Sequence, residues 1–263
     1  MSKIFETFGK RACVISPNDF SYQLQSKMCP FSNDWCDKAK KHTVGVCSIK
    51  TAAGNCIICP KRFYEKLTVF VEAGKLLNQG DDQIRWIKEV SLGDSFVDFI
   101  LFSSKKEKAI DFLGLEIQAL DTSGSMWMEI EKVLISKGIC QAHSLKPFKC
   151  VTINWKTTAK TTIMQIIEKA PYFENENKYL VLAIQKPFFD YLSNHYECKK
   201  WSHNSKDTIQ IHIYDYDDGN RIEVVKKVST NLISFREMLL FDIKTKKTNL
   251  LTRINSMLLK QKM

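Results

Sequence analysis

The sequence predicts a mixed α/β fold, in which helices flank a mixed central sheet, with a cysteine-rich module near the N-terminus. Hydrophobic residues make up 44% of the 263 residues, which is enough for a folded core. Short apolar segments with strand character alternate with segments whose apolar residues recur at helical spacing. Cysteines and turn-forming residues are concentrated before residue 60. These observations favour one large domain, or a domain with a small module.

Five of the nine cysteines are clustered between residues 29 and 59, at Cys29, Cys36, Cys47, Cys56 and Cys59. Turn formers surround them and no long periodic segment separates them, so we expect a small module stabilised by a metal. Four thiolates suit tetrahedral zinc or iron, and the residue types do not distinguish the two. The alternative is a set of unligated buried thiols.

A helix and three strands are predicted after the cysteines. Apolar residues at helical spacing predict a helix over 61–79, with Gly80 as its cap. Apolar segments then predict strands over 84–92, 95–103 and 113–120, the last two joined by the charged turn 104–109.

The rest of the chain also alternates between the two kinds of element. Its patterns predict helices over 126–136, 158–169 and 187–195, strands over 148–155 and 179–185, a hairpin of 208–214 and 221–228, and a basic helical tail over 246–263. No internal repeat is present.

The chain is basic, with 39 lysines and arginines against 29 acidic residues, a net charge of +10 and a pI near 9.1. This balance favours an anionic partner, of which nucleic acid is the commonest, although many basic proteins bind none. The lysines near the predicted sheet could contact DNA phosphates, or they could simply form a solvent-exposed face. They are Lys105, Lys106, Lys108, Lys156, Lys160 and Lys169.

The sequence gives no indication of a membrane partner. Its apolar segments are shorter than the roughly 20 residues that span a bilayer. The first ten residues also lack the apolar core of a signal peptide. We therefore expect a cytoplasmic protein whose cysteines are thiols or metal ligands rather than disulfides.

Two carboxylates stand out because they lie in apolar segments. Asp98 is within Ser95-Phe-Val-Asp-Phe-Ile-Leu-Phe102, and Glu116 is within Leu113-Gly-Leu-Glu-Ile-Gln-Ala-Leu120. Burying a carboxylate is costly unless it is paired or binds a cation. Gln118 shares a strand face with Glu116, since side chains alternate with period two. The sequence thus predicts a Mg²⁺ site suited to phosphodiester hydrolysis, or else an ordinary ion-paired sheet.

The order of these elements resembles the PD-(D/E)XK nuclease core: helix, strand, strand with Asp98, charged turn, strand with Glu116-Ile-Gln118, helix. It resembles the variant in which glutamine replaces the lysine. The words Cys29-Pro-Phe, Gly45-Val-Cys-Ser48, Ile58-Cys-Pro-Lys-Arg-Phe63 and Glu116-Ile-Gln-Ala-Leu-Asp-Thr122 are similar to the NotI-type restriction endonucleases. The resemblance covers roughly residues 25 to 170. The chain departs from the usual pattern at Val97, where many nucleases of this kind have proline.

The resemblance implies a homodimeric type II restriction endonuclease, which makes Mg²⁺-dependent double-strand cuts in DNA at a short site. A cognate DNA methyltransferase is expected in the same system. The family's metal-binding aspartate, glutamate and glutamine correspond to Asp98, Glu116 and Gln118, and the Ile117 carbonyl is a further metal ligand. An additional acidic residue corresponds to Glu89, for which Glu72 competes. The alternatives are a repair or recombination nuclease of the same fold, and a non-catalytic DNA-binding protein.

For the cysteines, the resemblance implies a structural iron or zinc held by Cys29, Cys36, Cys47 and Cys59, with Cys56 as a substitute ligand. It also implies three parts of the chain. Residues 1–62 are expected to form the metal module, 63–170 the nuclease core, and 171–263 a C-terminal part that completes the fold and contributes to DNA recognition or dimerisation.

Overall fold

A six-stranded mixed sheet forms the centre of the molecule. The computed structural model describes residues 2–36, 45–78, 84–106, 108–139, 151–196, 198 and 201–240. The predicted tail over 246–263 lies outside these residues, as does the start of the strand expected over 148–155. The strand order in the sheet is β12-β11-β10-β7-β6-β5. The strands are β5 (Arg85–Leu92), β6 (Ser95–Lys105), β7 (Lys108–Gln118), β10 (Tyr179–Gln185), β11 (Ile209–Tyr216) and β12 (Ile222–Thr230).

The sheet is antiparallel at both edges and parallel in the middle. Strands β5, β6 and β7 form an antiparallel meander, β10 runs parallel to both β7 and β11, and β12 returns antiparallel to β11. The crossover from β7 to β10 contains the long helix α4 (Trp155–Asn175). A parallel connection needs such a crossover, because the chain must return to the same end of the sheet. The mixed α/β fold predicted from the sequence is confirmed.

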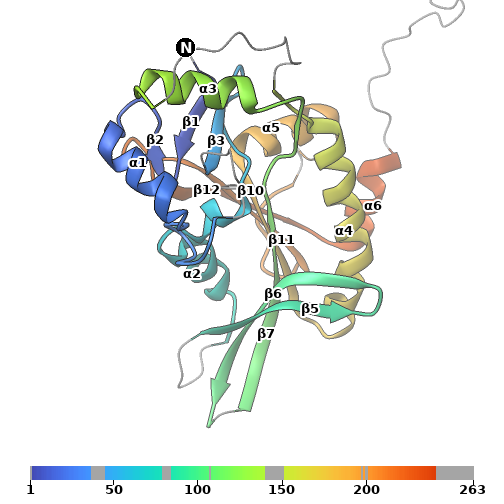
Figure 1. Ribbon diagram of the computed structural model, residues 1–263. Helices are drawn as coiled ribbons and strands as arrows, with labels where there is room; N and C mark the ends of the chain where they lie inside the picture. Colours follow the sequence, from blue (N-terminus) through green and yellow to red (C-terminus); the bar gives the residue numbers. More distant parts are fainter. Residues whose placement is uncertain are drawn as a thin grey trace, which may run out of the picture.

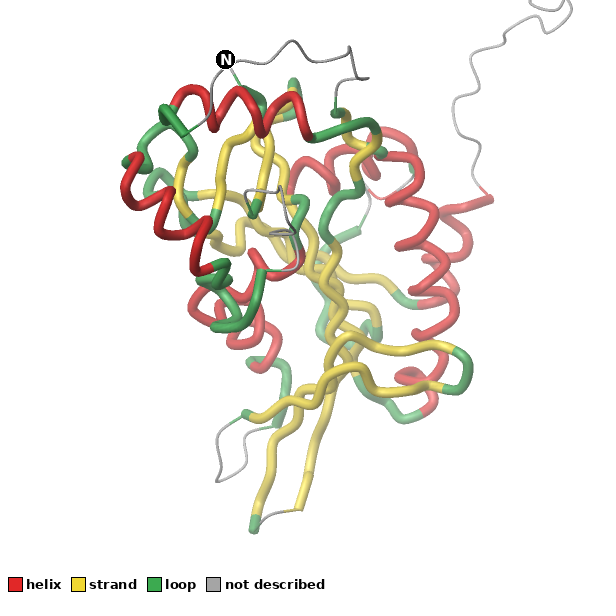
Figure 2. The backbone as a smooth tube through the Cα atoms, in the orientation of Figure 1, coloured by secondary structure: helices red, strands yellow, loops and turns green. Residues whose placement is uncertain are grey.

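Helices cover both faces of the sheet (Figures 1 and 2). On one face, α4, α5 (Lys186–His195) and α6 (Leu232–Leu240) share an apolar cluster with Leu180, Leu182 and Ile184 of β10. On the other, the 3₁₀ segment Pro60–Leu67 and α2 (Thr68–Gly74) pack with Val181 and Ala183. Alternate residues of β10 therefore point into the two clusters, which is why its sequence is continuously apolar.

A second, four-stranded sheet occupies the N-terminal region, where the sequence predicted no strands. Its order is β2-β1-β3-β4, and all its pairings are antiparallel. The strands are β1 (Ile4–Thr7), β2 (Lys10–Arg11), β3 (Val46–Thr51) and β4 (Gly54–Ile57). Helices α1 (Pro17–Ser26) and α3 (Trp127–Ser136) complete this part. The short strands left no detectable alternation in the sequence.

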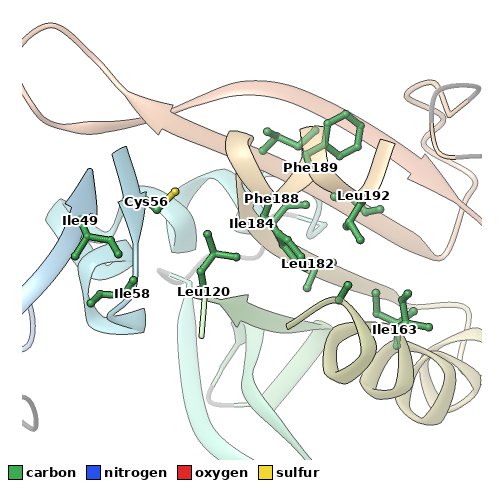
Figure 3. Packing of buried hydrophobic residues seen from close by; sticks show 14 of the residues in the cluster. Ile49, Cys56, Ile58, Leu120, Ile163, Leu182, Ile184, Phe188, Phe189 and Leu192 are labelled. Carbon is green, nitrogen blue, oxygen red and sulfur yellow. The ribbon is translucent and has the colours of Figure 1, made fainter. Parts of the chain in front are cut away.

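The N-terminal sheet is joined to the central sheet by apolar packing and by side-chain hydrogen bonds, among them those of Gln185 and of Tyr216, whose hydroxyl donates to Glu6 at 3.1 Å. The Gln185 amide at the end of β10 donates to the Ile57 carbonyl at 2.8 Å and accepts from the Ile57 amide at 2.7 Å. Figure 3 shows Ile49 and Ile58 facing the same cluster as Ile184. The position of β4 is thereby fixed relative to the end of a central strand.

Several boundaries differ from the predicted ones. Strands β6 and β7 extend through the charged segment to Lys105 and from Lys108, so the hairpin projects from the fold (Figure 1). The helix expected over 61–79 is broken where Lys66 and Leu67 have positive φ. Helix α4 is longer than expected, and the strand over 148–155 appears as β9 (Thr152–Ile153), paired with β8 (Thr122–Ser123). Within the described residues, no helix has the length and apolar character needed to cross a membrane.

Candidate active site

Three acidic residues lie in one row across β5, β6 and β7. Glu89 and Asp98 occupy opposite positions on β5 and β6. The pairs on either side of them are in register: Lys88 with Phe99, and Val90 with Val97. The same counting places Asp98 opposite Glu116, one step beyond the pair Phe99 and Leu115. Cross-strand partners share a face, so the row lies on the α4 side of the sheet, with Glu116.

The backbone is distorted where the row begins. Glu89 has a φ of +52°, which is uncommon for a residue with a side chain and unexpected inside a strand. The pairing of β5 with β6 is interrupted at this position alone. Such local strain persists where the surrounding structure imposes it, and it is concentrated at functional sites. Glu89 itself is exposed, Asp98 is partly buried and Glu116 is buried.

The carboxylates of Asp98 and Glu116 accept hydrogen bonds from backbone amides, which in a regular β-ladder would donate to backbone carbonyls. The Asp98 amide donates to Glu116 Oε1 at 3.2 Å, and the Ile117 amide donates to Asp98 Oδ2 at 2.8 Å. Each strand thus holds the side chain of the other in place. The regular pairing of β6 with β7 ends at Phe99, the residue that follows Asp98 in the chain.

Lys169 completes this arrangement from helix α4. Its ammonium donates to Glu116 Oε2 at 2.8 Å, and the lysine is only 3% exposed. The expectation that Lys169 lies on a surface where it would contact phosphate is therefore wrong. It lies on the buried face of α4 together with Ile166, Ala170 and Phe173.

Burial and charge crowding make both carboxylates hold protons more strongly than usual. Burial, followed by the charge of Asp98, raises the pKa of Glu116 to about 7, although Lys169 opposes the shift. Burial also raises the pKa of Asp98, against the Ile117 amide and Lys169, and Glu89 adds to the increase. Burial is the larger cause of both shifts, and a positive charge beside the row lowers both pKa values, as Lys169 does.

The remaining predicted positions lie around this row. Gln118 is half-buried, and its amide donates to the Ala119 carbonyl at 2.6 Å. Glu72 lies on α2 on the other side of the sheet, where it pairs with Lys75 and with Lys227 of β12. Glu89 and Glu72 are the two candidates for the additional acidic residue of the site, and of these two Glu89 lies beside Asp98. Within the described ranges, no group of three or more histidines, cysteines or acidic residues is closed into metal-binding geometry.

Most of the chain matches a known protein family. Residues 17–226 match the family model described as restriction endonuclease NotI. This chain belongs to the NotI restriction endonuclease family. Membership makes it a deoxyribonuclease, and DNA is the substrate class of the family. No curated protein matches the chain.

The matched range of the NotI family includes the cysteines. Cys29, Cys47 and Cys59 are buried, and Cys36 is partly buried. The Cys59 amide donates to the Cys47 carbonyl at 3.2 Å, and a backbone hydrogen bond from Gly9 reaches the Cys47 thiol. Burial, with the charges of Glu6 and Cys59, raises the pKa of that thiol well above its usual value.

Cys56 has different neighbours. Its sulfur lies 3.4 Å from the Thr51 hydroxyl, and the charge of Asp215 adds to the burial that raises the pKa of its thiol. The charge of Cys59 instead acts on the Cys47 thiol. This difference separates Cys56, within β4, from Cys47 near the start of β3 and Cys59 just after β4.

A buried ion pair, which the sequence did not predict, supports the cysteine region of this NotI-family chain. Arg62, three residues after Cys59, donates from Nε to Glu6 Oε2 at 2.8 Å, and both side chains are buried. The Arg62 guanidinium also lies 4.7 Å from the centre of the Phe31 ring, in the loop between Cys29 and Cys36. Arg62 thus connects β1, the Cys59 turn and the Cys29 loop.

The other predicted lysines are on the surface. Lys105 and Lys108 flank the tip of the β6–β7 hairpin, and Lys156 and Lys160 are exposed on the first turns of α4. Cys140, Cys150 and His143 lie outside the described residues.

Proposed function

We propose that this NotI-family chain is a type II restriction endonuclease that makes Mg²⁺-dependent double-strand cuts at a short DNA site. The observation that carries the proposal is the row of Glu89, Asp98 and Glu116, held by backbone amides and by Lys169. Such a concentration of acidic groups beside a buried lysine is costly for a structural site and useful for a catalytic one.

The donor set fits Mg²⁺. The three carboxylates are the hard oxygen ligands that this ion takes, and the Ile117 carbonyl is proposed as a further oxygen ligand. When bound, Mg²⁺ would supply a Lewis acid for the scissile phosphate and make water a stronger nucleophile at neutral pH. Burial raises the pKa of both Asp98 and Glu116, and a bound cation would favour their charged forms.

The chain's own residues divide the remaining work. Asp98 and Glu116 would hold the cation, and the amides of Asp98 and Ile117 hold these two carboxylates in place. Gln118 carries no charge, so we assign it to orient the attacking water or the phosphate by hydrogen bonding. Lysines of the hairpin and of α4 would hold the DNA backbone without reading its sequence.

The test is incubation of the purified protein with long unmethylated DNA of known sequence, with and without Mg²⁺, followed by sequencing of the fragment ends. Discrete Mg²⁺-dependent fragments whose ends share one short sequence are expected. A smear would instead identify a repair or recombination nuclease of the same fold. Salt-sensitive binding to DNA that stays intact would identify a non-catalytic DNA-binding protein.

We also propose a structural zinc or iron held by Cys29, Cys36, Cys47 and Cys59. The burial of three of these thiols and the effect of the Cys59 charge on the Cys47 thiol support it. A backbone N–H directed at the Cys47 sulfur would stabilise a thiolate there. With four protein ligands the site would have no open position, so its role would be structural.

The wider organisation follows from the same proposal. The parts 1–62, 63–170 and 171–263 would be the metal module, the nuclease core and a part for DNA recognition or dimerisation. Cutting both strands of a symmetric site suits a homodimer. A restriction enzyme of the cytoplasm also requires a methyltransferase that protects the host DNA at the same site.

A further inference from the structure

We propose that Lys169 is a positioning residue, whose ammonium holds Glu116 in the acidic row and competes with a divalent cation for the same carboxylate. This inference rests on the proposed function, and it assigns a role to a residue outside the strands that carry the acidic row. It starts from the partners of Glu116. One carboxylate oxygen accepts from the Asp98 amide at 3.2 Å and the other from Lys169 Nζ at 2.8 Å.

The ammonium cannot easily move to another position along the helix. Ile166, Ala170 and Phe173 are all buried on the same face of α4 as Lys169. The Phe173 ring packs directly against Gly114, in the space that a side chain at Gly114 would fill. Helix α4 is therefore fixed against β7 one turn after Lys169, which leaves Glu116 within reach of the amine.

The same geometry sets two effects against each other. A cation that binds the row must share or displace the Glu116 oxygen that Lys169 now occupies, and it also meets the positive charge of the ammonium. Lys169 thus weakens divalent binding. It also keeps Glu116 oriented beside Asp98, so it assists cleavage. Removing the charge of Lys169 should tighten divalent-cation binding and slow DNA cleavage. If Lys169 were purely structural, its removal would not produce these two opposite effects together.

The test uses Ca²⁺ as the probe, in the absence of DNA, with binding followed by isothermal titration calorimetry of the whole protein. Lys169→Met should bind Ca²⁺ about threefold more tightly or better, from the loss of one nearby charge. It should also cleave DNA about tenfold more slowly in single-turnover assays with Mg²⁺. Lys169→Arg keeps the charge and should bind Ca²⁺ as the wild type does. The exposed Lys206→Met is the matched control and should leave Ca²⁺ binding unchanged.

Unchanged or weaker Ca²⁺ binding by Lys169→Met would overturn the inference. Should that variant fail to fold, Lys169→Gln is neutral and can still hydrogen-bond to Glu116, and the same tightening is expected from it. Failure of the proposed function would look different. In that case Asp98→Asn would bind Ca²⁺ like the wild type, which would mean that the acidic row is not the cation site at all.

Discussion

Glu89 and Asp98 face each other across β5 and β6 at the single position where the pairing of these strands is interrupted. The interruption coincides with the positive φ of Glu89 and with the side-chain hydrogen bonds of Asp98. The backbone pairing of the sheet is therefore interrupted at the position where its carboxylates lie next to one another.

Asp98→Asn should reduce DNA cleavage by about 100-fold or more, because it removes a charge that would bind the metal while keeping the shape of the side chain. DNA binding should persist or strengthen, since a negative charge near phosphate is lost. Fragment analysis and a gel-shift titration measure the two effects. Glu223→Gln removes one charge from an exposed position on β12 and should leave cleavage unchanged. Full Mg²⁺-dependent cutting by Asp98→Asn would refute the assignment.

Glu89→Gln and Glu72→Gln should have opposite consequences. Glu89→Gln should slow cleavage by about tenfold or more with little loss of stability, because Glu89 is exposed and lies beside Asp98. Glu72→Gln should leave cleavage intact and lower the free energy of unfolding by roughly 1 kcal/mol, because Glu72 pairs with Lys75 and Lys227. Cleavage rates and urea unfolding of both variants decide the matter. A slow Glu72→Gln enzyme with a fast Glu89→Gln enzyme would reverse the assignment.

Cys47→Ser should lose the structural metal, and Cys56→Ser should keep it. The two substitutions change the same atom type on adjacent strands, so they serve as each other's control. Metal content of the purified proteins, measured by plasma mass spectrometry together with the unfolding temperature, provides the test. Equal metal content in the wild type and Cys47→Ser would exclude Cys47 as a ligand.

His212 should make folding sensitive to mild acid. Its ring is fully buried on β11, and burial, followed by the charge of Lys227, lowers its pKa to about 3. The unfolded chain takes up a proton below about pH 6.5, whereas the folded protein does not do so until about pH 3. The contribution of His212 to stability is therefore present above pH 6.5 and decreases as the pH falls, by up to about 1.4 kcal/mol per pH unit.

The variant His212→Leu tests this sign. Within the described part of the chain, neither ring nitrogen has a hydrogen-bond partner, so the substitution should change stability at pH 7.5 by no more than about 1 kcal/mol. As the pH falls to 5, the variant should become progressively more stable relative to the wild type. Urea unfolding of both proteins at pH 7.5, 6 and 5 measures the difference. Parallel pH dependences would show that His212 titrates normally.

Local patterns in the sequence predicted the central sheet well. The run Tyr179–Gln185 has the bounds of β10, and the acidic residues of β6 and β7 lie on paired strands. The alignment of Glu89 with Asp98 depends on strand register, and no local pattern records register. The N-terminal sheet was missed because its strands are only two to six residues long.

Lys169 could have been found from helical spacing. It lies three residues after Ile166 and four before Phe173, on the apolar side of α4. A charged residue at such a position needs a buried partner, and the sequence supplies several acidic candidates. Only the three-dimensional structure identifies that partner as Glu116, which lies 53 residues earlier in the chain.

The crossover between β7 and β10 also determines when the acidic row can form during synthesis. Glu89, Asp98 and Glu116 leave the ribosome before α4, and β7 stays at the edge of an unfinished sheet until β10 pairs with it. Lys169 and the strand that buries β7 arrive together, at the end of this crossover. A partly translated chain therefore carries all three carboxylates without the lysine that holds Glu116 and without the strand that covers the edge of β7.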